Sequence, residues 1–122
     1  MSDTLNALIR SGRKRKPGAR SDAQRVWLAK VGRKRRPVLV LTRPEVIDVR
    51  NLVSVAEITT SIRGLAAEVD LDQQTAGIDQ PAVINCDNLH TVARASLATF
   101  VGTVDADTMR KVCGAVSYAL GC

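Results

Sequence analysis

Arg35 Arg36 Pro37 Val38 Leu39 Val40 Leu41 Thr42 is the stretch that decides the fold of this chain. Four consecutive apolar residues, Val38 to Leu41, are bounded by Pro37 and Thr42, and this pattern predicts a short strand buried on both faces. Proline cannot donate a ladder hydrogen bond and fits at the first residue of a strand. We therefore expect Pro37 to begin the strand, with the permanent charge of Arg36 held at a fixed position beside it.

Further strands are predicted on both sides of this stretch. Residues 26–31 form a first strand, and the basic turn 32–35 joins it to the central strand as a hairpin with a cationic tip. Residues 52–60 predict a longer β-branched strand, in which four side chains share one face by alternation. These four are Val53, Val55, Glu57 and Thr59.

The second half of the chain predicts more short strands and one helix. Residues 67–72 alternate apolar and acidic, residues 82–92 form a strand pair or one strand with a polar break, and residues 100–104 form a last strand after a helical stretch at 93–97. A helix capped by Asp105 or Asp107 ends at Gly121 and buries Cys113 on its apolar face. The fold class expected is therefore α+β, mostly β, with a small barrel and a C-terminal helix.

Charge is distributed unevenly along the 122 residues, which are enough for one domain. Residues 1–36 hold 12 of the 18 basic and 2 of the 12 acidic side chains, a net charge of +10, whereas residues 37–122 carry −4. We divide the chain into a basic, flexible arm, 1–24, and a folded domain, 25–122. The basic segment fits a polyanionic partner such as nucleic acid, and equally a solvated tail.

Cysteines and hydropathy indicate a reducing compartment. The three cysteines contain no CxxC pair, so they predict neither a disulfide framework nor a zinc site. No apolar run reaches the length of a membrane span, and the N-terminus lacks the apolar core of a secretory signal. We expect a cytoplasmic protein without contact to a membrane.

Few residues could carry catalysis. The chain has one histidine, His90, within an apolar strand, and we expect it to be structural rather than catalytic. Neither a glycine-rich phosphate loop nor a metal-binding motif is present, and we expect no cofactor. Hydroxyls and cations remain, and if their two clusters converge they form a cationic pocket of the kind that holds a phosphate. The clusters are Thr59, Thr60, Ser61 and Arg63, and Arg33, Lys34, Arg35 and Arg36.

Motif order and spacing over residues 25–122 resemble the MazF/PemK toxins of bacterial toxin-antitoxin modules, and look most like their actinobacterial, mycobacterial-like branch. The matching strings are Val26 Trp27, Arg36 Pro37 Val38 Leu39 Val40 Leu41, Ile58 Thr59 Thr60, Arg63 Gly64 Leu65, Glu68 Val69, Cys86 Asp87 Asn88, Thr91 Val92, Met109 and Ala119 Leu120 Gly121. The chain departs from the family at Ala23 Gln24 Arg25, where an Arg Gly Glu or Arg Gly Asp is usual, and in its basic arm.

The resemblance implies a small SH3-like barrel of the CcdB/MazF type that cleaves single-stranded RNA at short sequences without metal. It implies Arg36 and Thr59 as the catalytic residues, with 2′-OH attack leaving a 2′,3′-cyclic phosphate and a 5′-OH. The general base stays open, because arginine remains protonated and threonine is a poor base. The RNA contacts implied are Arg33, Lys34, Arg35, Thr60, Ser61, Arg63, Asp87 and Asn88.

The resemblance also implies partners. It implies a homodimer and a MazE-like antitoxin whose disordered acidic tail covers the RNA site. The alternative is a noncatalytic CcdB-like toxin that binds gyrase on the same barrel, which does not require the Arg36 and Thr59 pair. A third hypothesis, nucleic-acid binding by the arm alone, leaves the motif order after residue 25 unexplained.

Overall fold

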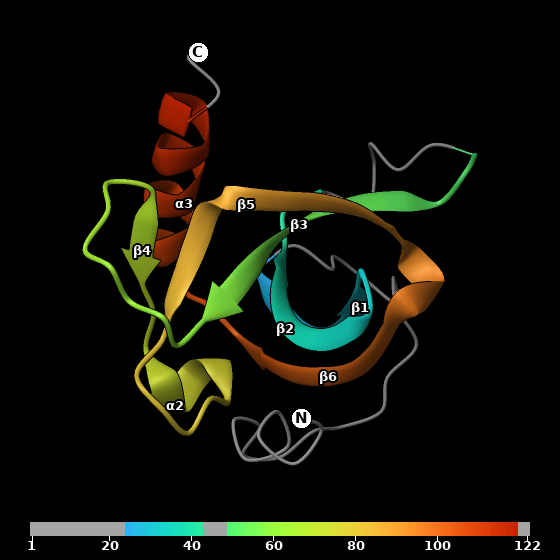
Figure 1. The fold of residues 1–122 in the computed structure, drawn as a ribbon, viewed down its shortest axis with the longest axis horizontal. Helices are drawn as coiled ribbons and strands as arrows, with labels where there is room; N and C mark the ends of the chain where they lie inside the picture. The colour runs from blue at the N-terminus through green and yellow to red at the C-terminus, as the bar shows by residue number, and fades with distance from the viewer. Residues whose placement is uncertain (1–23, 43–48, 120–122) are drawn as a thin grey trace.

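A strongly bent antiparallel sheet forms the body of the protein in the computed structural model, which describes residues 24–42 and 49–119 (Figure 1). The strand order is β4-β5-β3-β2-β1-β6, and helix α3 packs against β4 and β5. The elements are β1 Arg25–Val31, β2 Lys34–Val40, β3 Leu52–Thr59, β4 Glu68–Asp70, α2 Gln73–Ala76, β5 Val83–Ala93, η2 Arg94–Ser96, β6 Leu97–Thr103 and α3 Ala106–Ala119. The predicted arm, 1–24, lies almost entirely outside the described residues, so this domain boundary stays a prediction.

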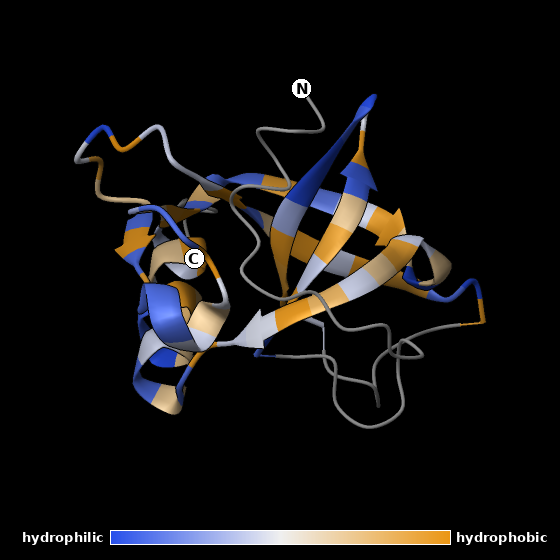
Figure 2. Ribbon diagram, turned by 90° about the horizontal axis from the view of Figure 1, so that it is seen from below, coloured by the Kyte–Doolittle hydropathy of each residue, from blue (hydrophilic) through white to orange (hydrophobic). Residues whose placement is uncertain are grey.

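The central strand is buried on both faces, as its apolar run predicts. Val38, Leu39 and Val40 have no exposed surface. Leu39 belongs to a helix-side cluster that also contains Val112 of α3, whereas Val38 and Val40 belong to a second cluster around Trp27. The alternation of hydrophobic and hydrophilic residues on the other strands is visible in Figure 2. One strand thus contributes to both halves of the core.

The β1–β2 hairpin is tighter than expected. Val31 pairs with Lys34, which leaves a two-residue turn, and β2 begins at Lys34 rather than at Pro37. The prediction that Pro37 opens the strand is therefore wrong. Pro37 lies opposite Leu28 of β1, and β3 pairs with β2 only from Val38 onward. At Pro37, β2 therefore has only one partner strand, so the lack of a proline N–H is tolerated.

The polar break in residues 82–92 is a bulge within one strand, β5. Its partner register jumps from Asn85 opposite Glu57 to Leu89 opposite Ala56, so residues 86–88 have no partner on β3. A bulge bends a strand and redirects its side chains. This one lies where the functional site forms.

Two other strands differ in extent from the sequence prediction. The strand expected at 67–72 is only β4, because Asp72 instead caps the short helix α2 by accepting a hydrogen bond from the Thr75 backbone N–H at 3.3 Å. Strand β6 begins at Leu97, three residues before the expected start, because Leu97 already pairs with Ala29. The helical stretch expected at 93–97 is confirmed as η2.

The C-terminal helix forms as expected, but its buried face is rotated. Asp105 caps it by accepting the Thr108 N–H at 2.7 Å, and this hydrogen bond lowers the pKa of the Asp105 carboxyl. The buried face is centred on Val112, and Cys113, about 100° further round the helix, is exposed. The prediction that Cys113 fills the core is therefore wrong. The expected helix end at Gly121 lies outside the described residues, and no described helix is long and apolar enough to cross a bilayer.

The two described cysteines should differ in reactivity. Cys86 is fully buried, and burial together with the charge of Asp87 raises the pKa of its thiol to about 11. In a Cys122→Ser background we expect Ellman's reagent at pH 8 to modify Cys113 at least about 100-fold faster than Cys86, because the reagent attacks accessible thiolate. Adding Cys113→Ser should remove the fast phase. Equal rates for both thiols in the folded protein would contradict this assignment.

Candidate active site

A cavity of about 450 Å³ opens where the β1–β2 hairpin, β3 and β5 meet, and we call it the Arg36 pocket. Its lining residues are Val31, Gly32, Arg36, Glu57, Thr59, Arg63, Asn85, Asn88 and His90. The two clusters of hydroxyls and cations identified in the sequence therefore do converge, through Arg36, Thr59 and Arg63. A similar hollow of about 500 Å³ lies between β4 and α3, and it is lined by a single cation, Lys111, beside two carboxylates.

Strand alternation explains why the pocket residues point the same way. Arg36 lies two residues before Val38 on β2, and Glu57 lies two residues after Val55 on β3, so each shares a face with the cluster around Trp27. Val38 and Val55 are the last apolar residues of this face toward the pocket, and Arg36 and Glu57 are the next residues on it. The pocket therefore lies where the apolar cluster ends and the same face becomes polar.

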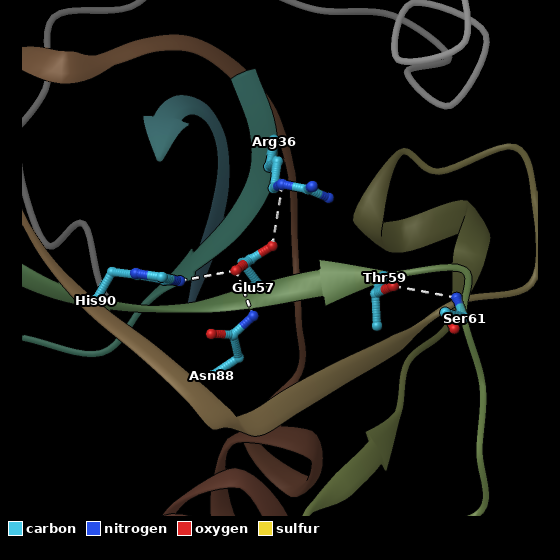
Figure 3. A network of polar contacts seen from close by, with 6 residues as sticks. All are labelled: Arg36, Glu57, Thr59, Ser61, Asn88 and His90. Carbon is cyan, nitrogen blue, oxygen red and sulfur yellow. Dashed lines mark hydrogen bonds and ion pairs between the residues drawn. The ribbon is translucent and has the colours of Figure 1, made fainter. Parts of the chain in front are cut away.

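Glu57 is the centre of the polar contacts in the pocket (Figure 3). Its Oε1 lies 3.2 Å from Arg36 Nε, and its Oε2 lies 2.7 Å from His90 Nε2 and 2.5 Å from Asn88 Nδ2. Only 9% of the Glu57 side chain is exposed. A buried carboxylate needs such partners, and here they come from two neighbouring strands.

The sequence context of His90, within an apolar strand, suggested that apolar neighbours would enclose it, but they do not. It lies opposite Val55, its side chain is 31% exposed, and its ring nitrogen contacts Glu57 in the pocket. The β5 bulge at 86–88 sets this position and also brings Asn88 to the same carboxylate oxygen. Neither contact follows from the sequence spacing, because the residues are 33 and 31 positions from Glu57.

Thr59 ends β3 at the rim of the pocket. Its Oγ1 accepts a hydrogen bond from the Ser61 backbone N–H at 3.0 Å (Figure 3). A hydroxyl that accepts one hydrogen bond can still donate its own hydrogen to another group. The Thr59 hydroxyl is thus fixed in position and can donate a hydrogen bond in the pocket that Arg36 and Arg63 also line.

Arg63 reaches the pocket from a loop that is wrapped around one carboxylate. Glu68 Oε1 accepts the backbone N–H groups of Gly64 at 2.8 Å, Arg63 at 3.1 Å and Leu65 at 3.2 Å. Charge-assisted hydrogen bonds to backbone donors are among the stronger ones in proteins. Glu68, which sequence reasoning did not assign to the site, therefore orders the loop that carries Arg63.

Glu68→Ala should loosen this loop. We expect amide hydrogen exchange of Arg63, Gly64 and Leu65 to accelerate by roughly 10-fold or more, because three donors lose their acceptor. Exchange measured by NMR tests this, with exchange in the β1–β2 hairpin as the internal reference. Glu68→Gln, which keeps one acceptor oxygen, should give a smaller effect. Unchanged protection at all three amides in Glu68→Ala would show that the loop is ordered by other contacts.

Several residues expected at the site do not line the pocket. They are exposed around it, on the hairpin tip, in the loop after β3 and at the β5 bulge: Arg33, Lys34, Arg35, Thr60, Ser61 and Asp87. Sequence reasoning missed Asn85, Glu57 and His90 as pocket residues. Glu57 had a usable signal, since an acidic residue on the buried face of a strand requires a partner.

The chemical groups of the pocket define what it can bind. Within residues 24–42 and 49–119, no group of three or more His, Cys, Asp or Glu side chains is placed to hold a metal ion. The pocket brings two arginines, a threonine hydroxyl, a carboxylate and an imidazole together. These groups can bind a phosphodiester, stabilise added negative charge and accept a proton.

This chain belongs to the family described as PemK-like, MazF-like toxin of type II toxin-antitoxin system, whose model matches residues 22–120. Endoribonuclease MazF3 of Mycobacterium tuberculosis is 46% identical over 69 residues, 57% of this chain. That match spans 66% of MazF3, slightly under two thirds of its length. Probable endoribonuclease MazF5 of the same species is 37% identical over 100 residues, covering 80% of this chain and 90% of MazF5.

Solved structures agree with the fold. Mycobacterium tuberculosis toxin MazF-mt6 is 37% identical with a TM-score of 0.71, over 80% of this chain and 96% of that one. A chain from a MazE-MazF crystal structure of Deinococcus radiodurans is 27% identical with a TM-score of 0.67, and the match covers 82% of this chain and 94% of that one. The expected mostly-β fold of the MazF type with a C-terminal helix is confirmed.

Proposed function

We propose that this protein is the toxin of a toxin-antitoxin pair and a sequence-selective endoribonuclease that cleaves single-stranded RNA without a metal ion, inhibiting translation and growth. The observation that supports this most directly is the convergence of Arg36, Thr59 and Arg63 on one pocket. Relatives at 46% and 37% identity are named endoribonuclease and probable endoribonuclease. The alternative, gyrase binding by a CcdB-like toxin, is not favoured by these relatives.

The reaction proposed is transesterification by the RNA itself. The ribose 2′-oxygen attacks the adjacent phosphorus and expels the 5′-oxygen, which leaves a 2′,3′-cyclic phosphate and a 5′-OH. Glu57 holds Nε of Arg36, so the terminal nitrogens remain for the phosphate, where they stabilise the developing charge and protonate the leaving oxygen. Thr59 positions the phosphate by donating its hydroxyl hydrogen.

RNA is held outside the pocket by the exposed polar residues around it. Arg33, Lys34 and Arg35 on the hairpin contact phosphates, and Thr60, Ser61 and Asp87 contact the nucleotides beside the cleaved bond. Arg63 and Asn88 contact the RNA from the wall of the pocket. Because phosphate contacts release counterions, RNA affinity should fall as salt concentration rises.

The partner proposed is a MazE-like antitoxin with an acidic disordered tail. The Deinococcus neighbour comes from a MazE-MazF crystal structure, and the cationic hairpin of this chain is complementary to such a tail. We further propose that the protein acts as a homodimer in the cytoplasm, where its RNA substrate is. The basic arm, 1–24, adds nonspecific affinity for RNA.

The test is cleavage of a long single-stranded RNA by the purified, antitoxin-free protein in EDTA, with 5′ ends mapped by primer extension. We expect cuts at one short sequence, with 5′-OH ends that polynucleotide kinase can label directly. A folded protein that cuts no RNA of varied sequence would overturn the proposal, and a gyrase inhibition assay would then test the alternative. Cutting that requires added Mg²⁺ would overturn the metal-independent mechanism.

A further inference from the structure

The pocket contains a carboxylate and an imidazole to which the mechanism above gives no chemical step. Glu57 Oε2 lies 2.7 Å from His90 Nε2, and both residues line the Arg36 pocket. The same mechanism lacks a group that removes the 2′-hydroxyl proton. Arginine stays protonated and threonine is a weak base, so neither Arg36 nor Thr59 is suited to this step.

Glu57 is better suited to orienting its neighbours than to taking the proton itself. Its Oε1 is paired with Arg36, its Oε2 has Asn88 and His90 as partners, and only 9% of its side chain is exposed. Both oxygens are therefore already engaged by donors. A carboxylate in this position holds the neutral His90 in the tautomer that has hydrogen on Nε2, which leaves the lone pair on Nδ1. Because 31% of the His90 side chain is exposed, a bound ligand can reach the imidazole.

We propose that His90 is the general base of the cleavage reaction and that Glu57 is a positioning residue for both His90 and Arg36. This inference rests on the proposed ribonuclease function. The 2′-hydroxyl proton passes to His90 Nδ1, and the 2′-oxygen forms its bond to phosphorus as the bond from phosphorus to the 5′-oxygen breaks. The 5′-oxygen leaves with the electron pair and takes a proton from Arg36, and water then restores both side chains to their starting protonation states.

Glu57 thus links the two ends of the reaction. One of its oxygens orients the cation that meets the phosphate, and the other orients the base that meets the 2′-hydroxyl. Figure 3 shows both partners converging on Glu57, with the guanidinium tip of Arg36 extending away from the carboxylate. This arrangement follows the logic of catalytic triads, in which a carboxylate fixes the tautomer and orientation of a histidine.

The pH dependence separates this role from a structural one. A general base acts in its unprotonated form, so cleavage that depends on one should weaken toward acid pH. The charged or titratable groups that line the pocket around His90 are Glu57 of β3, Arg36 of β2 and Arg63 of the following loop. The arginines stay protonated, so replacing His90 and Glu57 in turn tests whether the acid limb depends on either of them.

The experiment measures single-turnover cleavage of an RNA that carries the mapped site. We expect His90→Gln to lower the rate about 10²–10⁴-fold and to abolish the acid limb, while affinity for the same RNA with a 2′-deoxyribose at the cleaved position stays within about 3-fold. Imidazole added to His90→Gly should restore part of the rate. Thr91→Ala, on the next and exposed residue of β5, is the matched control and should cleave like the wild type. Glu57→Gln should lower the rate and retain RNA binding.

A substrate with sulfur in place of the 5′-oxygen distinguishes base from acid. Sulfur leaves without protonation, so Arg36→Ala should recover on this RNA the part of its activity that was lost with leaving-group protonation, whereas His90→Gln should remain slow. Should His90→Gln fail to fold, His90→Asn serves in its place. The inference is overturned if a folded His90 variant keeps the wild-type rate and acid limb. A wild-type protein that cuts no RNA would instead overturn the proposed function, so the two failures are distinguishable.

Discussion

Arg36→Ala is expected to lower RNA cleavage by roughly 10³-fold or more while the protein stays folded. Removing one preorganised donor that stabilises transition-state charge typically lowers the rate by about 10²–10³-fold, and Arg36 also protonates the leaving oxygen in the mechanism proposed. Its side chain is 40% exposed, and Glu57 keeps Asn88 and His90 as partners. The loss of stability should therefore be modest. Single-turnover cleavage and thermal unfolding measure the two effects.

Arg36→Lys is the matched variant for this prediction. Lysine keeps the charge but has a single nitrogen. It therefore cannot contact Glu57 through one nitrogen and present other nitrogens to the phosphate, as arginine does. We expect a rate between those of Arg36→Ala and the wild type. Arg35→Ala, on the neighbouring exposed residue, should instead raise the RNA concentration needed for half-maximal rate. A folded Arg36→Ala protein that cleaves at the wild-type rate would remove Arg36 from the catalytic assignment.

Gly102→Ala is expected to have the largest effect on stability. A Cβ at this position of β6 would lie 2.3 Å from the backbone carbonyl carbon and oxygen of Ala76 and 2.6 Å from the Thr75 oxygen. The contact is reciprocal, because a Cβ at Gly77 would lie 2.3 Å from the Val101 oxygen. Backbone atoms cannot move aside as a flexible side chain can, so α2 would have to separate from β6. We expect a loss of about 3 kcal/mol or more and a fall in Tm of more than about 10 °C.

Gly114→Ala provides the opposite case in the same protein. Gly114 lies in α3, and a Cβ at this position would meet no atom of another element within 4 Å. Alanine is the better helix former, so this variant should gain about 0.5–1 kcal/mol. Thermal and urea unfolding of both variants measure the difference. Equal stability of Gly102→Ala and the wild type would show that α2 does not pack on β6 as closely as described.

Much of the fold was predictable because local patterns carry it. The apolar run Val38 to Leu41 predicts a strand with core on both faces, and its first three residues are fully buried as expected, whereas Leu41 follows the end of β2 and is partly buried. The sequence offered Asp105 or Asp107 as the cap of the C-terminal helix, and the structure uses Asp105, directly before the start of α3 at Ala106. The boundaries that differed, at Pro37 and at 67–72, depend on neighbours, since a pairing partner or a cap decides where a strand ends.

The candidate site was only partly predictable. The residues themselves indicated a cationic site with hydroxyls, and motif resemblance singled out Arg36 and Thr59, which do share a pocket. The partners of Glu57 were not predictable, because His90 and Asn88 reach it through a β5 register that the bulge shifts by three residues. The exposure of Cys113 likewise depends on which side of α3 meets the sheet.

The sequence by itself determined the strands and helix, the position of a basic hairpin and the family to which the chain belongs. These depend on hydrophobic period, turn and cap residues and motif order, which act over a few positions. Only the tertiary structure decided that one buried carboxylate, Glu57, joins Arg36 to His90. The physical reason is that a buried charge must find its partners in space, and strand pairing rather than sequence distance brings them within hydrogen-bond reach.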